Sequence, residues 1–459
     1  MGVTWLADAE PETFWAHHAW TDFAALPQKE YAIVVLPLYG FASHGADRPL
    51  DIEEMLGASL LRQTVERVKR HFVVRVLPPL RFAPAAKNGG FFGLDPETAH
   101  DLVAEIAAGV KAAGFHKLVF FNTSPFNEPF VASAAMDARA GLNLRTYVIH
   151  ARSLGLDPGR DNAGEVAPFA SHLAELLAEI RQHLAPPVAS PAIDPSVLHV
   201  PPPAIFPAYR SRYLPALSSA QLTALPAKKR PLVIVPTASI EQHGPHLPVG
   251  VDAILGQALL SAALAKLPSD FPVFVAPSLT YGKSIEHHGF PGTISISTRT
   301  LRRLGLAMAG QLRDVGIRRL AFLNTHGGNS AVLTSLLHEI PESLGINATL
   351  LRHGCQPDVS VQEAAWGFHA DEWETALMLA CAPELVRMDK AVCEYPARLG
   401  DPGELRPENA VATFAWMTRD ISRCGVMGDP TRATEEKGRR WLSNAADNLS
   451  SKIRSLAGE

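Results

Sequence analysis

One short segment in the second half of the chain concentrates side chains that bind metal ions. In "PTASIEQHGPHLPVGVD", residues 236–252, Glu241, His243 and Asp252 come directly after an apolar run. A further histidine, His326, lies in "NTHGGN" after another apolar run. Imidazole nitrogens and carboxylate oxygens suit zinc, manganese and iron, and one carboxylate can bridge two ions. Two neighbouring ions can activate a shared water molecule and polarise a carbonyl group, which is the chemistry of hydrolysis.

Strands and helices alternate around these residues. The runs "PLVIVP", "FPVFVAP" and "RLAFLN" are typical of buried strands, whereas "AILGQALLSAALAKL" and "LRRLGLAMAGQLRDVG" carry apolar residues at helical spacing. Such alternation predicts an α/β fold, a mostly parallel sheet with helices on both faces. Ligands bind to such sheets beyond the carboxyl ends of the strands. The loop with Glu241 and His243 and the loop with His326 each follow a predicted strand, so both would lie at this edge of the sheet.

The chain also resembles itself, in three segments that recur in the same order. The matching pairs are "FAALPQKEYAIVVLP" with "LTALPAKKRPLVIVP", "GFHKLVFFNTSPFN" with "GIRRLAFLNTHGGN", and "NAGEVA" with "HADEWE". Three ordered matches at a nearly constant offset indicate a tandem duplication with one fold per half. We place the first domain at 1–190, a proline-rich extended linker at 191–215 and the second domain at 216–459.

Composition narrows the possible partners. The chain has 459 residues, which is too many for one ordinary core, and its formal net charge of −4 gives no basic excess for nucleic acid. The N-terminus has no apolar signal region, no run is long enough to cross a membrane, and the four cysteines form no C-x-x-C pair. We therefore expect a cytoplasmic protein with reduced thiols and a small-molecule substrate.

Four motifs together resemble one known family. The segments "IEQHGPHLPVGVD", "FPGTISIS", "NTHGGN" and "HADEWETALML", followed by "GDPTRATEEKG", look like those of the creatininase family of metal-dependent amidohydrolases. The resemblance covers residues from about 231 to 437. It implies a three-layer α/β/α sandwich, divalent metal ions (two per chain, as zinc, manganese or iron) and assembly into homo-oligomers. The tandem copy could instead make the chain a pseudo-dimer.

The resemblance also implies roles for the metal ligands. Glu241 and His326 fall at the positions of ligands to the first ion, His243 at that of a ligand to the second, and Asp252 at that of the bridging carboxylate.

Two catalytic positions follow from the "HADEWE" motif. His369 falls where the family places a general acid that protonates the leaving nitrogen, work that suits an imidazole. Glu374 is interpreted as a metal-binding group or a residue that supports one. The alternative for Glu374 is a helix N-terminal carboxylate stabilised by the helix dipole.

Two positions depart from creatininase itself. Gly328 stands where creatininase has a carboxylate that binds the second metal, so that ion would take another ligand, such as Glu374, or bind weakly. Creatininase closes over its substrate with tryptophans, and here only Trp366 lies near a matching place. Creatinine is therefore a poor candidate. Relatives with similar motifs hydrolyse formamidopyrimidines or trim a modified peptide in cofactor biosynthesis.

Substrate-binding candidates come from three loops: Glu286 and His287 in "SIEHHGFPGT", the neighbouring Gly327 and Gly328, and Trp366. Solvated polar residues are the alternative for the histidine loop, and "FPGT" is interpreted as a structural turn.

The first half lacks most of these side chains. The aligned pairs are Glu241 with Ala42, His326 with Ser124, His369 with Asn162, Glu374 with Ala167, His243 with His44, and Asp252 with Asp51 or Glu53. One histidine and one carboxylate cannot hold a binuclear centre. We predict a degenerate domain that binds no catalytic metal, and that replaces a neighbouring subunit or walls the active site.

Three functions remain compatible with these observations. The first is metal-assisted hydrolysis of a C–N bond in an amide, formamide or cyclic amide of a small molecule or modified peptide. The second is a non-catalytic metal- or ligand-binding scaffold. The third is a lyase or isomerase on the same metal centre.

Overall fold

The computed structural model describes residues 10–81, 90–156, 166–182, 207–229, 231–352, 354–396, 399–405 and 416–458. Most of the predicted linker, 191–206, lies outside these ranges, as does Asn162.

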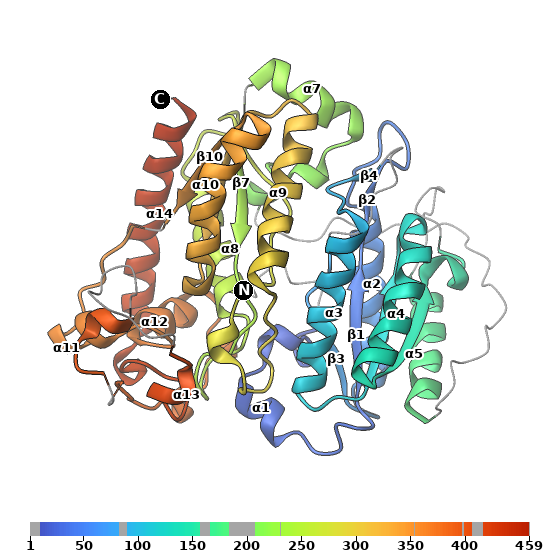
Figure 1. Cartoon of the computed structure of the whole chain (residues 1–459), viewed down its shortest axis with the longest axis horizontal. Coiled ribbons are helices and arrows are strands. Elements are labelled where there is room, and N and C mark those ends of the chain that lie inside the picture. Colours follow the sequence, from blue (N-terminus) through green and yellow to red (C-terminus); the bar gives the residue numbers. More distant parts are fainter. Residues whose placement is uncertain are drawn as a thin grey trace.

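Two four-stranded sheets, each entirely parallel, form the centres of the two halves, which lie side by side in Figure 1. The first sheet has the order β3-β1-β5-β6 and the second the order β8-β7-β9-β10. The strands are β1 (Ile33–Leu38), β3 (Val74–Val76), β5 (Lys117–Asn122), β6 (Arg145–His150), β7 (Leu232–Thr237), β8 (Val273–Val275), β9 (Arg319–Asn324) and β10 (Asn347–Leu351). A short antiparallel pair, β2 (Phe41–Ala42) and β4 (Gly90–Phe91), stands apart.

The two sheets also share one register. Ile33 of β1 lies opposite Lys117 of β5, and the matching residues of the second half, Leu232 and Arg319, lie opposite each other too. All residues of β1, β5 and β7 are buried, as expected of central strands covered on both faces. The tandem duplication and the predicted α/β fold class are therefore confirmed.

Helices form the outer layers of each half. They are α1 (Trp20–Ala25), α2 (Ile52–Val68), α3 (Pro96–Ala112), α4 (Glu128–Leu142), α5 (Ala167–Gln182), α6 (Pro207–Arg210), α7 (Ser219–Lys229), α8 (Val251–Ala265), α9 (Thr298–Asp314), α10 (Ser330–Leu344), α11 (Val361–Trp366), α12 (Glu372–Cys381), α13 (Thr418–Ile421) and α14 (Glu435–Ala457).

The strand order determines which face each helix covers. Because the chain runs outward from β1 to β3 and then back across the sheet, right-handed crossovers place α2 on one face and α3 and α4 on the other. In agreement, α2 packs on α5 and α3 on α4, while α8 packs on α14 and α9 on α10 in the second half. No helix among the described residues combines the length and apolarity needed to cross a membrane.

The halves share one hydrophobic core. A single cluster of buried side chains runs through both, and α3 packs against α9 across the junction in Figure 1. The last part of the predicted linker, 207–215, is folded. Tyr209 and Tyr213 are buried, Arg210 forms an ion pair with Asp51, and an Arg212 guanidinium N–H donates to the Phe271 carbonyl over 2.7 Å. This segment therefore contacts both halves.

Candidate metal centre

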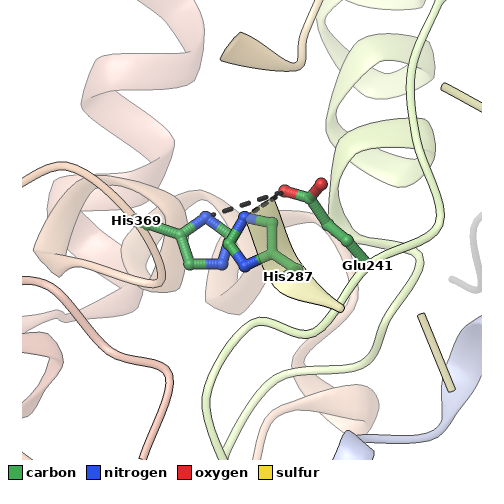
Figure 2. A group of neighbouring side chains, drawn as sticks. All are labelled: Glu241, His287 and His369. Carbon is green, nitrogen blue, oxygen red and sulfur yellow. Dashed lines mark ion pairs between the residues drawn. The ribbon is translucent and has the colours of Figure 1, made fainter. Parts of the chain in front are cut away.

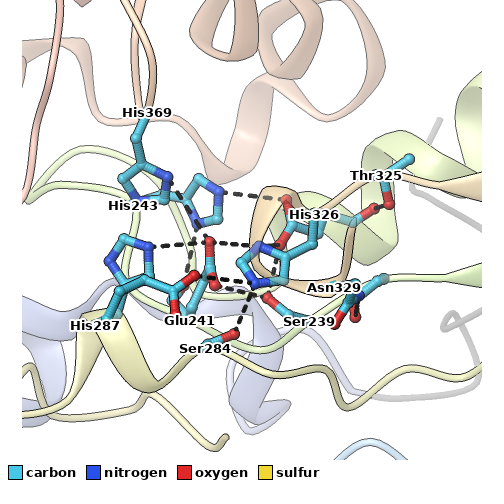
Figure 3. Close-up of polar contacts among 12 residues, drawn as sticks. Ser239, Glu241, His243, Ser284, His287, Thr325, His326, Asn329 and His369 are labelled. Carbon is cyan, nitrogen blue, oxygen red and sulfur yellow. Dashed lines mark hydrogen bonds and ion pairs between the residues drawn. The ribbon is translucent and has the colours of Figure 1, made fainter. Parts of the chain in front are cut away.

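The polar side chains of the centre come from the carboxyl ends of the second sheet. Glu241 and His243 follow β7, and His326 follows β9. Asp252 is the second residue of α8, and Glu374 lies in the first turn of α12. All five side chains are buried or nearly so. Figure 3 shows Glu241, His243 and His326 close together.

The first group of possible metal ligands is Glu241, Asp252 and His326. The Nδ1 atom of His326 lies 3.1 Å from Glu241 Oε1 and 3.5 Å from Asp252 Oδ2. The Ser239 hydroxyl lies 2.9 Å from Glu241 Oε2 and 2.7 Å from Asp252 Oδ2, and so spaces the two carboxylates. One nitrogen and two carboxylate oxygens thus converge as they do at zinc or manganese sites.

The second group is His243, His369 and Glu374. The Nε2 atom of His243 lies 3.6 Å from Asp252 Oδ1 and 3.8 Å from Glu374 Oε2. Within the described part of the chain, this nitrogen is buried without a hydrogen-bond partner. Asp252 turns one oxygen to His326 and the other to His243, which is the arrangement of a bridging carboxylate. The donor set fits divalent metal ions.

A third group, Glu241, His287 and His369, appears in Figure 2. Glu241 Oε1 lies 3.4 Å from His287 Nε2 and 3.7 Å from His369 Nδ1. The His369 ring stacks between those of His287 and His243, with centroids 4.3 Å apart in each case. His287, predicted to bind substrate, is therefore buried within the centre itself.

Backbone carbonyls orient three of these imidazoles. His243 Nδ1 lies 3.1 Å from the Glu241 carbonyl, His326 Nε2 lies 2.8 Å from that of Lys283, and His369 Nε2 lies 2.7 Å from that of Gln242. Since a carbonyl only accepts, each of these nitrogens carries a hydrogen. The other nitrogen of each neutral ring then presents a lone pair to the centre, as metal ligation requires.

Charge in the metal-free centre is shared between acids and imidazoles. Burial opposes protonation of His326, but Glu241 and Asp252 outweigh it and raise its pKa to about 10. Burial likewise opposes protonation of His243, and Glu374 and Asp252 raise its pKa to about 9. Burial, with the neighbouring His287 and His243, holds the pKa of His369 well below its usual value, so His369 is neutral.

The remaining predicted residues lie around this centre or apart from it. Glu286 Oε1 is 3.6 Å from His326 Nε2, and its other oxygen is 3.5 Å from Lys283 Nζ. A side chain at Gly328 would collide with Glu286, whereas Gly327 has open space around it. Trp366 packs instead against a separate apolar cluster that contains Leu399, Leu405, Ile421 and Met427.

Sequence reasoning missed Ser239, Gln242 and Thr418. Ser239 stands two residues before Glu241, a proximity that could have drawn notice. Gln242 contacts His287 and Gly425, and Thr418 contacts His287. These partners are separated by 45 to 183 positions, so no local spacing reveals them.

The equivalent corner of the first half is closed by its own contacts. Glu53 is the second residue of α2 as Asp252 is of α8, so Glu53 rather than Asp51 holds the equivalent place. His44 Nε2 lies 2.7 Å from Glu53 Oε1, and the Ser124 hydroxyl donates to the same oxygen over 3.3 Å. Every group of potential metal ligands found among the described residues belongs to the second half.

A segment of the first half supports the loops of the centre. The Val249 N–H donates to the His18 carbonyl over 2.7 Å and the Gly250 N–H to the Ala16 carbonyl over 2.8 Å. The Trp15 indole N–H donates to the Gly292 carbonyl over 2.9 Å. The loop that carries Glu241, His243 and Asp252 is therefore backed by residues from the other half.

Comparison with known proteins identifies several similar chains. The family model for creatininase, described as creatinine amidohydrolase, matches residues 16–183 and 215–453. A mycofactocin precursor peptide peptidase of Mycolicibacterium smegmatis is 35% identical over 231 residues, which are 49% of this chain and 85% of that protein. Creatinine amidohydrolase of Pseudomonas putida is 27% identical over 250 residues, 49% of this chain and 88% of that protein. A solved structure described as "Creatininase Mn" has a TM-score of 0.46 at 23% identity, covering 54% of this chain and 99% of its own.

Proposed function

The chain belongs to the creatininase family of metal-dependent amidohydrolases, and we propose that its second half cleaves a C–N bond at a binuclear metal centre. One observation carries the proposal. Asp252 divides its two oxygens between His326 and His243, and His243 Nε2 is buried without a hydrogen-bond partner among the described residues, facing carboxylate oxygens of Asp252 and Glu374 at 3.6 and 3.8 Å. A buried polar nitrogen aimed at carboxylates is costly unless a cation completes the group.

We assign the ligands as follows. Glu241, Asp252 and His326 would hold the first ion, and His243, Asp252 and Glu374 the second. Glu374 thus supplies the carboxylate that Gly328 cannot. When bound, the ions supply Lewis acidity that polarises a substrate carbonyl and lowers the pKa of water.

His369 moves the proton in this proposal. Its Nε2–H is held by the Gln242 carbonyl, so a neutral ring turns Nδ1 towards Glu241. That nitrogen accepts a proton from the attacking water as oxygen bonds to the carbonyl carbon. It then donates the same proton to the nitrogen as the C–N bond breaks, which leaves a carboxylic acid, an amine and the imidazole in its starting form.

The substrate we favour is an amide of a modified peptide rather than creatinine. The relative with 35% identity is named a peptide peptidase, and Trp366 packs in an apolar cluster. We propose that the first half, 1–190, acts as a built-in neighbour that supports the metal loop, joined through 191–215 to the catalytic domain at 216–459. The hydrogen bonds that the Val249 and Gly250 N–H groups donate to the His18 and Ala16 carbonyls support that role.

Metal content per chain tests the proposal. Protein purified without a polyhistidine tag and supplied with manganese, iron and zinc should hold about two ions by plasma mass spectrometry. His326→Ala should lower that number. A panel of N-terminal and C-terminal peptide amides, followed by mass spectrometry, should then give a cleaved product. A chain that takes up no ion after reloading would overturn the hydrolase proposal and leave a binding scaffold.

A further inference from the structure

We propose that His287 is a catalytic hydrogen-bond donor to the substrate oxygen and not a metal ligand, with Gln242 as the positioning residue that determines its tautomer. The proposal rests on the proposed function, because a substrate must enter the centre. Its structural part, the tautomer, stands independently of any metal.

The orientation of the Gln242 amide is determined by two backbone groups. Its Oε1 accepts from the Gly244 N–H over 2.9 Å, and its Nε2 donates to the Gly425 carbonyl over 3.0 Å. Reversing the amide would set donor against donor and acceptor against acceptor. The second hydrogen on Nε2 therefore belongs to the remaining neighbour, His287 Nδ1, at 3.0 Å.

This contact determines which nitrogen of His287 carries the hydrogen. Since Gln242 donates to Nδ1, that nitrogen presents a lone pair, and the neutral ring carries its hydrogen on Nε2. The Thr418 hydroxyl, 2.9 Å from Nδ1, can donate to the same lone pair. The protonated Nε2 lies 3.4 Å from Glu241 Oε1, inside the centre.

The hydrogen-bonding pattern of the His287 ring is thus the reverse of that of the other three histidines of the centre. His243, His326 and His369 each give one hydrogen to a backbone carbonyl, so the nitrogen that faces inward is the one that presents a lone pair when the ring is neutral. His287 receives a hydrogen on its outer side and turns an N–H inward. To ligate a metal, its ring would have to carry the hydrogen on Nδ1, where it would face the Gln242 N–H and lose that hydrogen bond.

An inward N–H suits the developing charge of amide hydrolysis. As water adds to a carbonyl, its oxygen becomes negative, and an oriented donor in a water-poor site stabilises it without transferring a proton. His287 is buried, and its ring stacks on that of His369, the proposed proton carrier, with centroids 4.3 Å apart. The donor and the proton carrier therefore stand side by side next to Glu241.

Three variants separate the alternatives. His287→Leu removes the donor, His287→Gln keeps an N–H, and His326→Leu removes a proposed ligand. Zinc content per chain should match the wild type in both His287 variants and fall in His326→Leu. Loss of one zinc from His287→Leu would identify His287 as a ligand and overturn the proposal.

Nitrogen NMR of ¹⁵N-histidine-labelled, metal-free protein reads the tautomer directly. The signal that disappears in His287→Gln should show a protonated Nε2 and an unprotonated Nδ1. Gln242→Glu, whose carboxylate accepts, should move the hydrogen to Nδ1. A wild-type ring with its hydrogen on Nδ1 would overturn the proposal even if zinc binding and hydrolysis were established.

Acetohydroxamate, an amide-like chelating anion, probes the donor role on zinc-loaded protein. A hydrogen bond to a charged oxygen corresponds to about 10- to 100-fold in affinity, so His287→Leu should weaken binding by at least about tenfold and His287→Gln by less. Unchanged affinity in His287→Leu would overturn the donor role. If the wild type takes up no zinc, the proposed function fails, and the NMR result still decides the tautomer.

Discussion

Gly328→Ala should weaken metal binding although residue 328 is not a ligand. A Cβ atom there would lie 2.3 Å from the Lys283 carbonyl oxygen, 2.3 Å from Glu286 Oε1 and 2.5 Å from His326 Nε2. The Glu286 carboxylate can swing away, but the Lys283 carbonyl belongs to the backbone. That carbonyl accepts the 2.8 Å hydrogen bond that orients His326, so the substitution disturbs the ligand through its support.

Gly328→Ala should affect both the stability of the fold and the affinity for metal. Inserting a methyl group into a tightly packed place costs about 1–3 kcal/mol of stability. Loss of the hydrogen bond that orients a ligating histidine typically weakens metal affinity by about 10- to 100-fold, or about 1.4–2.8 kcal/mol. We therefore expect a lower melting temperature in the metal-free protein and a zinc dissociation constant raised by at least about tenfold.

The adjacent glycine supplies the control. A Cβ at Gly327 would meet nothing within 4 Å, so Gly327→Ala should leave both zinc affinity and melting temperature close to the wild type. Zinc affinity is measured by competition with a chelator, and stability by a thermal scan without metal. If the two alanine variants are indistinguishable in both measurements, the argument that Gly328 protects the orientation of His326 is wrong.

Three further outcomes are expected. Zinc affinity should rise with pH, because zinc must displace the proton that His326, whose pKa is about 10, retains at neutral pH. Calorimetry in buffers of different ionisation enthalpy should detect the released proton, and zinc binding that is independent of pH would contradict this expectation. Asp22→Asn breaks the paired contacts to Arg387 at 2.5 and 2.6 Å, so it should cost about 1 kcal/mol at pH 7. Burial opposes ionisation of Asp22, but His18 and the Arg387 guanidinium outweigh it and hold the pKa of Asp22 well below its usual value. This stability difference should therefore shrink as acid protonates Asp22, and a gap that persists at low pH would argue against the ion pair. His44→Ala removes one of the hydrogen-bond partners of Glu53 and should lower the melting temperature but leave zinc content unchanged. A loss of zinc would show a metal in the first half.

Local pattern was sufficient for the architecture and for most of the centre. Strand-like runs in both halves predicted the parallel sheets, and the loops after β7 and β9 predicted where Glu241 and His326 would meet. Asp252, which follows β7 at the start of α8, lies at the same carboxyl edge of the sheet, next to His326. These inferences succeed because parallel strands end at a common edge, so their loops are neighbours whatever the remaining chain does.

Exact partners were not accessible in this way. The role of His287 depends on Gln242, Gly425 and Thr418. Thr418 contacts His287 itself and Gly425 orients the Gln242 amide, and both come from a distant part of the chain. Likewise, only the structure places Glu53 rather than Asp51 opposite His44, and backs the loop of Glu241 and His243 with the Ala16 and His18 carbonyls.

The sequence by itself thus determined the duplicated parallel sheets and the chemical types of the candidate metal-binding side chains, because the spacing of apolar residues and the ligand chemistry are local properties. Tertiary structure alone decided which nitrogen of each histidine faces the centre. That choice is made by the hydrogen bonds on the far side of each ring, and their partners are placed there by the packing of the whole fold.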